Sequence, residues 1–458
     1  MRPTNGPDPH DVPVVALAPD AAIVDGPSGE VVWGGSPFRL QRLDPAAKAV
    51  LDTVASTPPA NWSDAEAALA RRLLIDGVLE RRVADHAAAP PLDPGTVDVV
   101  VPCRDHGPLL PRLVERLADI GPATITIVDD GSGAPLPHLG DSVRVVRHTT
   151  ALGPGAARNR GAAEGTAAWL LFVDADIELL DGWWPPLASA ATSWPHPAGV
   201  APRVLGADRG DRPAIVRPRS RVPFTPGAAL LVQRSAFDEV GGFATDLVGG
   251  EDVDLVWRLI DDGHLVAYEP ASVVRHPEQA TLRARLRQQV SYGASQAALA
   301  VRHPAKVRST EMSPWSVAIW ALALGSPRAR MASAALWAVS AARFAVELRT
   351  WSRTPVADAI RLAGGGTIRA GAPLAETTRR IWWPLLAAGS LAWRPPRRWL
   401  AASVVAGARH PARLLDELAM GAGSLLGAWR CRSVNAYRPA SITSDDLLGP
   451  ASGSSLRS

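Results

Sequence analysis

The chain has 458 residues, 47% hydrophobic and 20% charged, which is long enough for two or three domains. It contains only two cysteines, Cys103 and Cys431, which excludes a disulfide framework and fits a reducing compartment. The first 20 residues lack a basic stretch followed by an apolar core, so we expect no signal peptide.

The net charge of +3 hides a strong asymmetry along the chain. From Arg275 onward there are 25 Lys and Arg against 9 Asp and Glu, and the same region is rich in Trp, Ala and Leu. This composition favours an anionic membrane surface over nucleic acid, and no nucleic-acid-binding motif accompanies it. We therefore expect a cytoplasmic protein associated with the inner face of the cell membrane, with no nucleic-acid partner.

The N-terminal part predicts a small separate domain. Residues 1–12 are polar and rich in Pro, which predicts disorder. Residues 13–86 combine short strand-like runs with two helices whose N-caps are Asp44 and Ser63, a pattern typical of a winged-helix module. The Ala- and Pro-rich stretch 87–95 is predicted as a linker.

Residues 96–280 alternate strands with helices and form the predicted catalytic core. Six apolar runs with strong β content occur at 97–101, 124–128, 143–146, 169–173, 228–232 and 265–268. Such strands separated by helices predict an α/β fold with a mostly parallel sheet covered on both faces. Ligands bind sheets of this kind at the carboxyl ends of the strands, where the acidic motifs fall.

Residues 281–440 are predicted to be helical, with apolar, Trp-rich stretches. Each stretch is broken by Arg, Pro or Gly before the roughly 18 residues that a membrane-spanning helix needs. We interpret them as interfacial or mutually packed helices, and re-entrant segments remain an alternative. Residues 441–458 read as a flexible polar tail.

Asp174-Ala175-Asp176 directly follows the apolar run 169–173. Side chains alternate along an extended segment, so Asp174 and Asp176 point the same way. Two carboxylates held close repel each other, which favours a divalent cation between them that carries a phosphate-rich ligand. A strand that simply ends in an acidic turn is the alternative.

Two earlier strands also end in candidate donor-binding residues. Pro102 and Arg104 end the first strand, and Asp129 and Asp130 end the second beside a glycine turn. A carboxylate at such a place can accept hydrogen bonds from a nucleobase or from ribose hydroxyls. Acidic turns after strands are also common without a ligand.

A glycine turn at 153–155 leads into a helix that carries Arg158 and Asn159. The helix N-terminus and these two side chains are candidates for nucleotide contacts. An ordinary helix start with solvated arginines is the alternative.

Gly249-Gly250 allows a mobile loop, and Glu251 and Asp252 then occupy the first turn of a helix. We interpret Asp252, with Glu251 beside it, as the base that activates an acceptor hydroxyl; an N-capping cluster is the alternative. His276 is either a metal ligand or a structural histidine.

In their order along the chain, these motifs resemble the inverting family-two glycosyltransferases with a GT-A fold. The resemblance implies a UDP-sugar donor whose uridine is held by Asp129 or Asp130. It implies Mg²⁺ or Mn²⁺ on Asp174 and Asp176, and a base at Asp252. The processive branch carries Gln-x-x-Arg-Trp, whereas this chain has Gln-Gln-Val-Ser-Tyr at 288–292, which puts polysaccharide synthesis in doubt.

The N-terminal part resembles the precursor-peptide recognition domains of ribosomal-peptide maturation systems, in segments 34–38, 42–46 and 74–79. A plain stabilising domain is the alternative. Together with 291–295 and 301–304, the whole chain resembles the mycofactocin biosynthesis glycosyltransferases. That resemblance implies transfer of glucose from UDP-glucose onto mycofactocin or its precursor, building a short β-linked oligosaccharide, with the precursor peptide bound by the N-terminal module.

Two other functions stay open at this point. One is a membrane-associated transferase for lipid or cell-wall glycans. The other is a non-catalytic peptide-binding scaffold, against which stands the presence of every carboxylate that the motif series requires.

Overall fold

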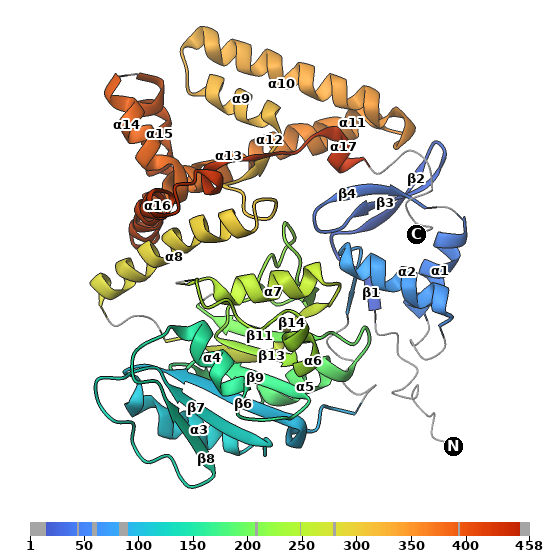
Figure 1. Ribbon diagram of the computed structural model, residues 1–458. Coiled ribbons are helices and arrows are strands. Elements are labelled where there is room, and N and C mark those ends of the chain that lie inside the picture. Colours follow the sequence, from blue (N-terminus) through green and yellow to red (C-terminus); the bar gives the residue numbers. More distant parts are fainter. Residues whose placement is uncertain are drawn as a thin grey trace, which may run out of the picture. The chain divides into compact units, whose positions relative to one another are not determined.

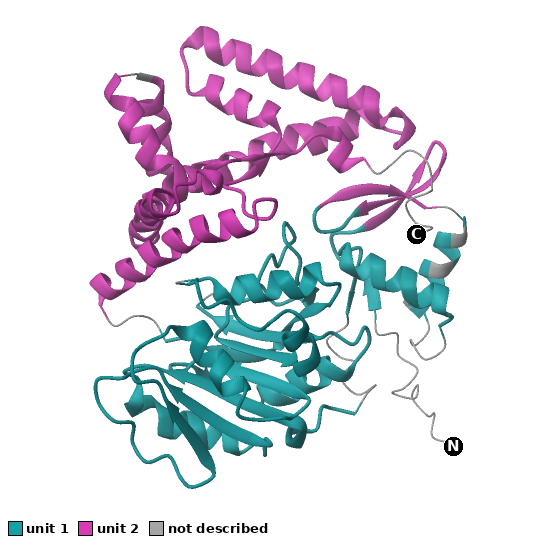
Figure 2. Ribbon diagram, in the orientation of Figure 1, with its two compact units in different colours: residues 1–21, 34–37, 45–278 teal, residues 22–33, 38–44, 279–458 magenta. Residues whose placement is uncertain are grey.

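The computed structural model describes residues 15–43, 45–56, 62–81, 90–206, 209–247, 249–277, 281–392 and 394–448. The chain forms two compact units (Figure 2). Unit 1 comprises residues 1–21, 34–37 and 45–278, and unit 2 comprises residues 22–33, 38–44 and 279–458. The predicted disorder at 1–12, the N-cap Asp44 and parts of the predicted linker and tail lie outside the described residues.

Unit 1 is built on a nine-stranded sheet with the order β10-β14-β11-β13-β9-β6-β7-β8, in which β12 also pairs with β14 (Figure 1). The strands are β6 (Val97–Cys103), β7 (Thr124–Asp129), β8 (Val143–Arg147), β9 (Trp169–Val173), β10 (Glu178–Leu179), β11 (Gly199–Leu205), β12 (Ala214–Ile215), β13 (Ala229–Gln233) and β14 (Val266–Arg275). The pairings β6–β7, β6–β9, β7–β8 and β11–β14 are parallel. Among the antiparallel pairings, only β13–β9 is longer than two residue pairs.

Both faces of this sheet are covered because its central strands are apolar on both sides. Leu171 and Val173 of β9 face a core that also contains Leu113 of α3 (Leu110–Ala118) and Leu187 of α5 (Trp184–Thr192). Phe172 faces the other way and packs in a three-ring cluster whose other members are Phe237 and Phe243. A strand buried on both faces reads as a continuous apolar run, which is what made β9 predictable.

The predicted α/β class is confirmed: unit 1 has a mixed, mostly parallel sheet accompanied by helices. Its first four strands lie in the order β8-β7-β6-β9, the 3-2-1-4 order with which a Rossmann sheet begins. The sheet then departs from a purely parallel pattern, because β13 runs antiparallel to both neighbours.

The winged-helix module predicted at 13–86 is not confirmed. In unit 1, β1 (Val15–Leu17) pairs with β5 (Leu79–Arg81), accompanied by helices α1 (Pro45–Ser56) and α2 (Asp64–Ile75). The three-stranded sheet β2-β3-β4, with strands β2 (Ala22–Gly26), β3 (Gly29–Gly34) and β4 (Arg39–Arg42), falls largely in unit 2. The predicted Ser63 cap of α2 is present as a full capping box with Glu66.

Unit 2 is mostly helical, and two of its longest helices pack through glycines. Helix α8 (Leu282–Arg302) lies against α16 (Pro411–Cys431), where a Cβ on Gly293 would stand 2.0 Å from the Met420 carbonyl oxygen. A Cβ on Gly423 would stand 2.0 Å from the carbonyl oxygen of Val290. Only residues without a side chain allow these two backbones to come so close.

The expectation that no apolar stretch in this region reaches the length of a membrane-spanning helix is wrong. The helical stretch Pro327–Thr350, which contains α10 (Pro327–Glu347), has 24 residues and is long and apolar enough to cross a membrane. Arg328 and Arg330 were taken to interrupt the apolar stretch. An α-helix tolerates arginine, so these residues do not interrupt it.

Candidate active site

Two of the predicted metal ligands, Asp176 and His276, lie close to each other beyond the carboxyl end of β9, and the third, Asp174, directly follows that strand. The backbone N–H of Asp174 donates to the Ala228 carbonyl at 3.0 Å, and that of Ile177 donates to the Asp174 carbonyl at 3.2 Å. This turn presents Asp176, whose Oδ2 lies 3.7 Å from Nε2 of His276. His276 directly follows β14, so strands far apart in sequence supply the two residues.

The chemistry of this group fits a divalent cation. Burial raises the pKa of the Asp174 carboxyl; Arg158 opposes this shift, and the charge of Asp176 adds to it. A cation bound between the carboxylates would relieve this strain between like charges. Carboxylate oxygens and an imidazole nitrogen form a donor set that Mg²⁺ or Mn²⁺ accepts. Asp174, Asp176 and His276 are therefore the residues here that could hold such an ion.

Arg158, on α4 (Pro154–Ala162), joins this group to the start of α7 (Glu251–Asp261). Its Nη2 donates to Asp174 Oδ1 at 2.6 Å, and its Nη1 donates to Glu251 Oε1 at 2.7 Å. The side chain is only 4% exposed, and its guanidinium carbon lies 5.1 Å from the centre of the Phe243 ring. Burial alone would lower the pKa of Arg158, but Asp174 and Glu251 outweigh burial and raise it. The guanidinium therefore stays charged and fixes both carboxylates.

Asp252 is held differently from its neighbour Glu251. Gly249 and Gly250 have φ values of +91° and +84°, so the chain turns sharply into α7. The Asp252 carboxylate accepts the N–H groups of Gly227 at 2.6 Å and Val253 at 2.8 Å. Burial, with the charge of Glu251, raises the pKa of Asp252 to about 6. A carboxylate with this pKa is ionised at neutral pH yet remains a useful proton acceptor.

Gly227 is required at this contact. A Cβ at position 227 would stand 2.7 Å from the Cβ of Asp252 and 3.1 Å from its Oδ2. Gly227 was not predicted as a site residue, because Pro226-Gly227 before a strand is typical of an ordinary turn.

The two acidic residues after β7 have partners within the chain. Asp129 accepts the N–H of Ser132 at 2.9 Å and pairs with Arg147 at 3.1 Å. Asp130 lies 2.7 Å from Nδ1 of His148 and also accepts two backbone N–H groups. Burial would raise the pKa of Asp130, but these hydrogen bonds lower it. Both residues shape the loop after β7, and their contact with a nucleotide stays a prediction.

The three remaining residues predicted to bind the sugar donor differ in their exposure and in their hydrogen-bond partners. Pro102 is partly buried on β6, and the Arg104 side chain is 61% exposed. The amide of Asn159 binds the backbone of Phe243 through two hydrogen bonds of 2.8 Å. Arg104 is thus accessible to a ligand, whereas the Asn159 amide already has partners on both sides. Their contacts with a donor stay predictions.

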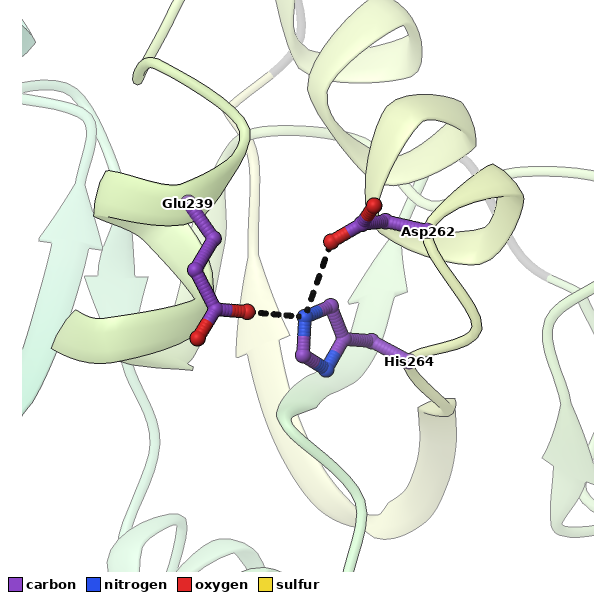
Figure 3. A group of neighbouring side chains, drawn as sticks. All are labelled: Glu239, Asp262 and His264. Carbon is purple, nitrogen blue, oxygen red and sulfur yellow. Dashed lines mark hydrogen bonds and ion pairs between the residues drawn. The ribbon is translucent and has the colours of Figure 1, made fainter.

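A second group of metal-ligand type lies at the other end of α7 (Figure 3). His264 Nε2 is 2.9 Å from Glu239 Oε2 and 3.5 Å from Asp262 Oδ2. The group is separated from Glu251 by the whole helix, about 16 Å at 1.5 Å per residue. Its two carboxylates are exposed and both lie against the same imidazole nitrogen, so we assign the group no role in the site.

The comparisons with known proteins identify the family. Residues 98–245 match the family described as Glycosyl transferase family 2. The chain is 33% identical over 460 aligned residues to the Pre-mycofactocin glycosyltransferase of Mycobacterium tuberculosis, with 90% of this chain and 94% of that protein covered. The chain belongs to the mycofactocin glycosyltransferases of family 2. As a member, it is a glycosyltransferase that acts in mycofactocin biosynthesis.

Other similarities of this mycofactocin glycosyltransferase are more distant. The N-acetylglucosaminyl-diphospho-decaprenol L-rhamnosyltransferase of M. tuberculosis is 29% identical over 229 residues, covering 39% of this chain and 75% of that protein. A mannosyltransferase from Pyrobaculum calidifontis in complex with GDP-Man and Mn²⁺ has a TM-score of 0.44 at 17% identity, covering 76% of this chain and 93% of that one. Glucosyl-3-phosphoglycerate synthase from M. tuberculosis has a TM-score of 0.35 at 17% identity, covering 48% and 82%.

Proposed function

We propose that this enzyme transfers glucose from UDP-glucose, with inversion, onto mycofactocin or its precursor, and that it repeats the transfer to build a short β-linked chain. One observation supports the proposal: the consecutive residues Gly227 and Ala228 form hydrogen bonds with Asp252 and with Asp174, respectively. Gly227 donates to the carboxylate of Asp252, and the Ala228 carbonyl accepts the N–H of Asp174. The base and the first residue of the acidic pair are thus fixed to one point of the backbone, as an in-line displacement requires.

In the proposed reaction, Asp252 takes the proton of an acceptor hydroxyl while that oxygen attacks C1 of the glucose. The bond between C1 and the UDP oxygen breaks, and UDP leaves with the electron pair. Asp174, Asp176 and His276 would hold Mg²⁺ or Mn²⁺, which neutralises charge on the departing diphosphate when bound. Arg158 keeps Asp174 and Glu251 in place throughout, without changing its own charge.

The donor nucleotide is proposed to contact the loops at the ends of β6 and β7. Asp129 or Asp130 would bind the uridine. The hydrogen bonds that both residues accept shape the turn in which they lie. The exposed Arg104 would meet the phosphates, and Pro102 and Asn159 would line the same side. A guanidinium suits phosphate because it offers several donors in one plane.

Two further partners belong to the proposal. The N-terminal segment would bind the precursor peptide, and unit 2 would bind the anionic inner face of the cell membrane. Residues 279–458 carry 24 Lys and Arg against 8 Asp and Glu. Among the described residues, 19 of the 22 exposed large hydrophobic side chains belong to unit 2. Positive charge beside exposed apolar side chains is the composition that anionic bilayers attract.

Mass spectrometry of reaction products tests the donor, the acceptor and the number of transfers. The purified enzyme would be incubated with Mn²⁺, a mycofactocin-type acceptor, and UDP-glucose, UDP-galactose or GDP-mannose in separate reactions. We expect a ladder of hexose additions with UDP-glucose, lost when a chelator is added. Transfer only from another donor, or only to a lipid acceptor, would contradict the proposal.

A further inference from the structure

The segment 209–228 connects β11 to β13 and ends at the active site. Beyond the contacts of Gly227 and Ala228, the Pro223 carbonyl accepts the indole N–H of Trp257 at 2.9 Å. Trp257 lies on α7, the helix that carries Asp252. This end of the segment is thus attached both to the base and to its helix.

The other end of the segment is tied to the N-terminal part of unit 1 by arginines. Arg212 donates to Glu80 Oε2 at 2.7 Å and to Asp20 Oδ1 at 2.9 Å. Arg217 donates to Asp76 Oδ1 at 2.8 Å and to the carbonyl of Ile75 at 3.2 Å, at the end of α2. Arg212 is 30% exposed and Arg217 24%, so water competes only partly for these pairs.

Further hydrogen bonds hold the middle of the segment in place. The Arg221 guanidinium donates to the carbonyls of Arg212 and Pro213, at 3.0 and 2.6 Å. The Arg221 backbone N–H donates to Ser36 Oγ at 2.6 Å. Strand β12 also pairs with β14, so the segment is held at several points along its length.

We propose that Arg212 and Arg217 are positioning residues for sugar transfer: by tying segment 209–228 to Asp20, Asp76 and Glu80, they fix Gly227 and through it Asp252. This inference rests on the proposed role of Asp252 as the base. It gives residues of the N-terminal part a function in catalysis that is separate from any peptide binding. Misplacement of a reacting group by 1 Å can cost up to about a hundredfold in rate, so a loosened segment has a measurable effect.

The test compares Arg217→Gln and Arg212→Gln with a matched control, Arg144→Gln, which removes the pair with Glu164 elsewhere in unit 1. Hydrogen exchange of intact full-length protein and transfer kinetics are measured on each. In both test variants we expect faster exchange across 209–228 and a kcat lowered about tenfold, with the KM for UDP-glucose within about twofold. The control should change neither. Arg217→Lys, which can still pair with Asp76, should recover part of the lost kcat.

Asp76→Asn breaks the same pair from the other side and serves where an arginine variant does not fold. Unchanged exchange in the folded variants would overturn the inference, and so would faster exchange with an unchanged kcat. Exchange is read without substrates, so this outcome is distinct from failure of the proposed function. That failure would appear as wild-type enzyme that transfers no glucose.

Discussion

Glu251 and Asp252 are neighbours in the chain with different hydrogen-bond partners. Glu251 pairs directly with the guanidinium of Arg158, whereas Asp252 accepts hydrogen bonds from two backbone N–H groups and feels the charge of Arg158 without a direct pair in the part of the chain that the structure describes. Burial, with the charge of Glu251, raises the pKa of Asp252, which makes its carboxylate a better proton acceptor. This difference supports our proposal that Asp252 is the base and that Glu251 orients Arg158.

Asp252→Asn should lower kcat by about a thousandfold, because the amide cannot accept the hydroxyl proton. UDP binding, measured by calorimetry in the presence of Mn²⁺, should stay within about twofold of wild type. The control is Asp262→Asn, the same change at the opposite, exposed end of α7. Turnover of Asp252→Asn at the wild-type rate would rule out Asp252 as the base.

The same residue predicts the acid limb of the pH–rate profile. The pKa of Asp252 is raised to about 6, so the carboxylate form that accepts a proton is lost as the pH falls through 6. We expect kcat/KM to be constant from about pH 7 upward and to fall about tenfold per pH unit below 6. A profile that is flat down to pH 4.5 would contradict this assignment. Protein stability should be followed in parallel to separate titration from unfolding.

At the scale of elements, strands marked by a continuous apolar run could be predicted from the sequence, whereas a strand whose run is interrupted could not. The apolar runs of β6, β7 and β9 gave both the strands and the acidic motifs at their ends. Strand β11 was missed because Pro202 and Arg203 interrupt its apolar run, and the register shifts between the same two residues.

Within the site, some predicted residues lie close to one another, but their partners were not foreseen. Asp176 and His276 lie 3.7 Å apart, although they come from motifs 100 positions apart in the chain. The pairing of Arg158 with Glu251 joins residues 93 positions apart, and no local pattern encodes it. The contact of Gly227 with Asp252 depends equally on a connection between strands whose path only the folded chain defines.

Gly227→Ala tests the importance of that connection. The added Cβ would lie 2.7 Å from the Asp252 Cβ, so the base must move. We expect kcat to fall roughly ten- to a hundredfold, with smaller effects on UDP binding. Gly366→Ala is the matched control, since no atom lies within 4 Å of its added Cβ. Equal kinetics for both variants would show that the close approach at Gly227 is dispensable.

At the scale of the whole molecule, the two units differ in surface chemistry. Among the described residues, unit 1 exposes only three large hydrophobic side chains, Leu109, Val145 and Leu152. Unit 2 exposes 19, including Val339 and Val346 on α10, beside an excess of arginine. We propose that unit 1 catalyses the sugar transfer and that unit 2 contacts the membrane.

Sedimentation with lipid vesicles tests this division. We expect binding to phosphatidylglycerol-containing vesicles in 0.1 M salt and weaker binding in 0.5 M salt, because salt screens the arginines. Val339→Asp with Val346→Asp should weaken binding about tenfold or more by removing apolar contact and adding negative charge. Val145→Asp, an exposed valine in unit 1, should leave binding unchanged. Equal binding to neutral vesicles, or none to either kind, would contradict the proposed membrane contact.

The stereochemistry of the first transfer tests the central claim most directly. The claim is a single displacement in which Asp252 activates the acceptor and UDP leaves from the opposite side of C1. With UDP-glucose, whose glucose is α-linked, and a mycofactocin-type acceptor, we predict that NMR of the freshly formed product shows one β-linked glucose. An α-linked product would contradict the account, because retention cannot arise from one displacement by an acceptor activated at Asp252.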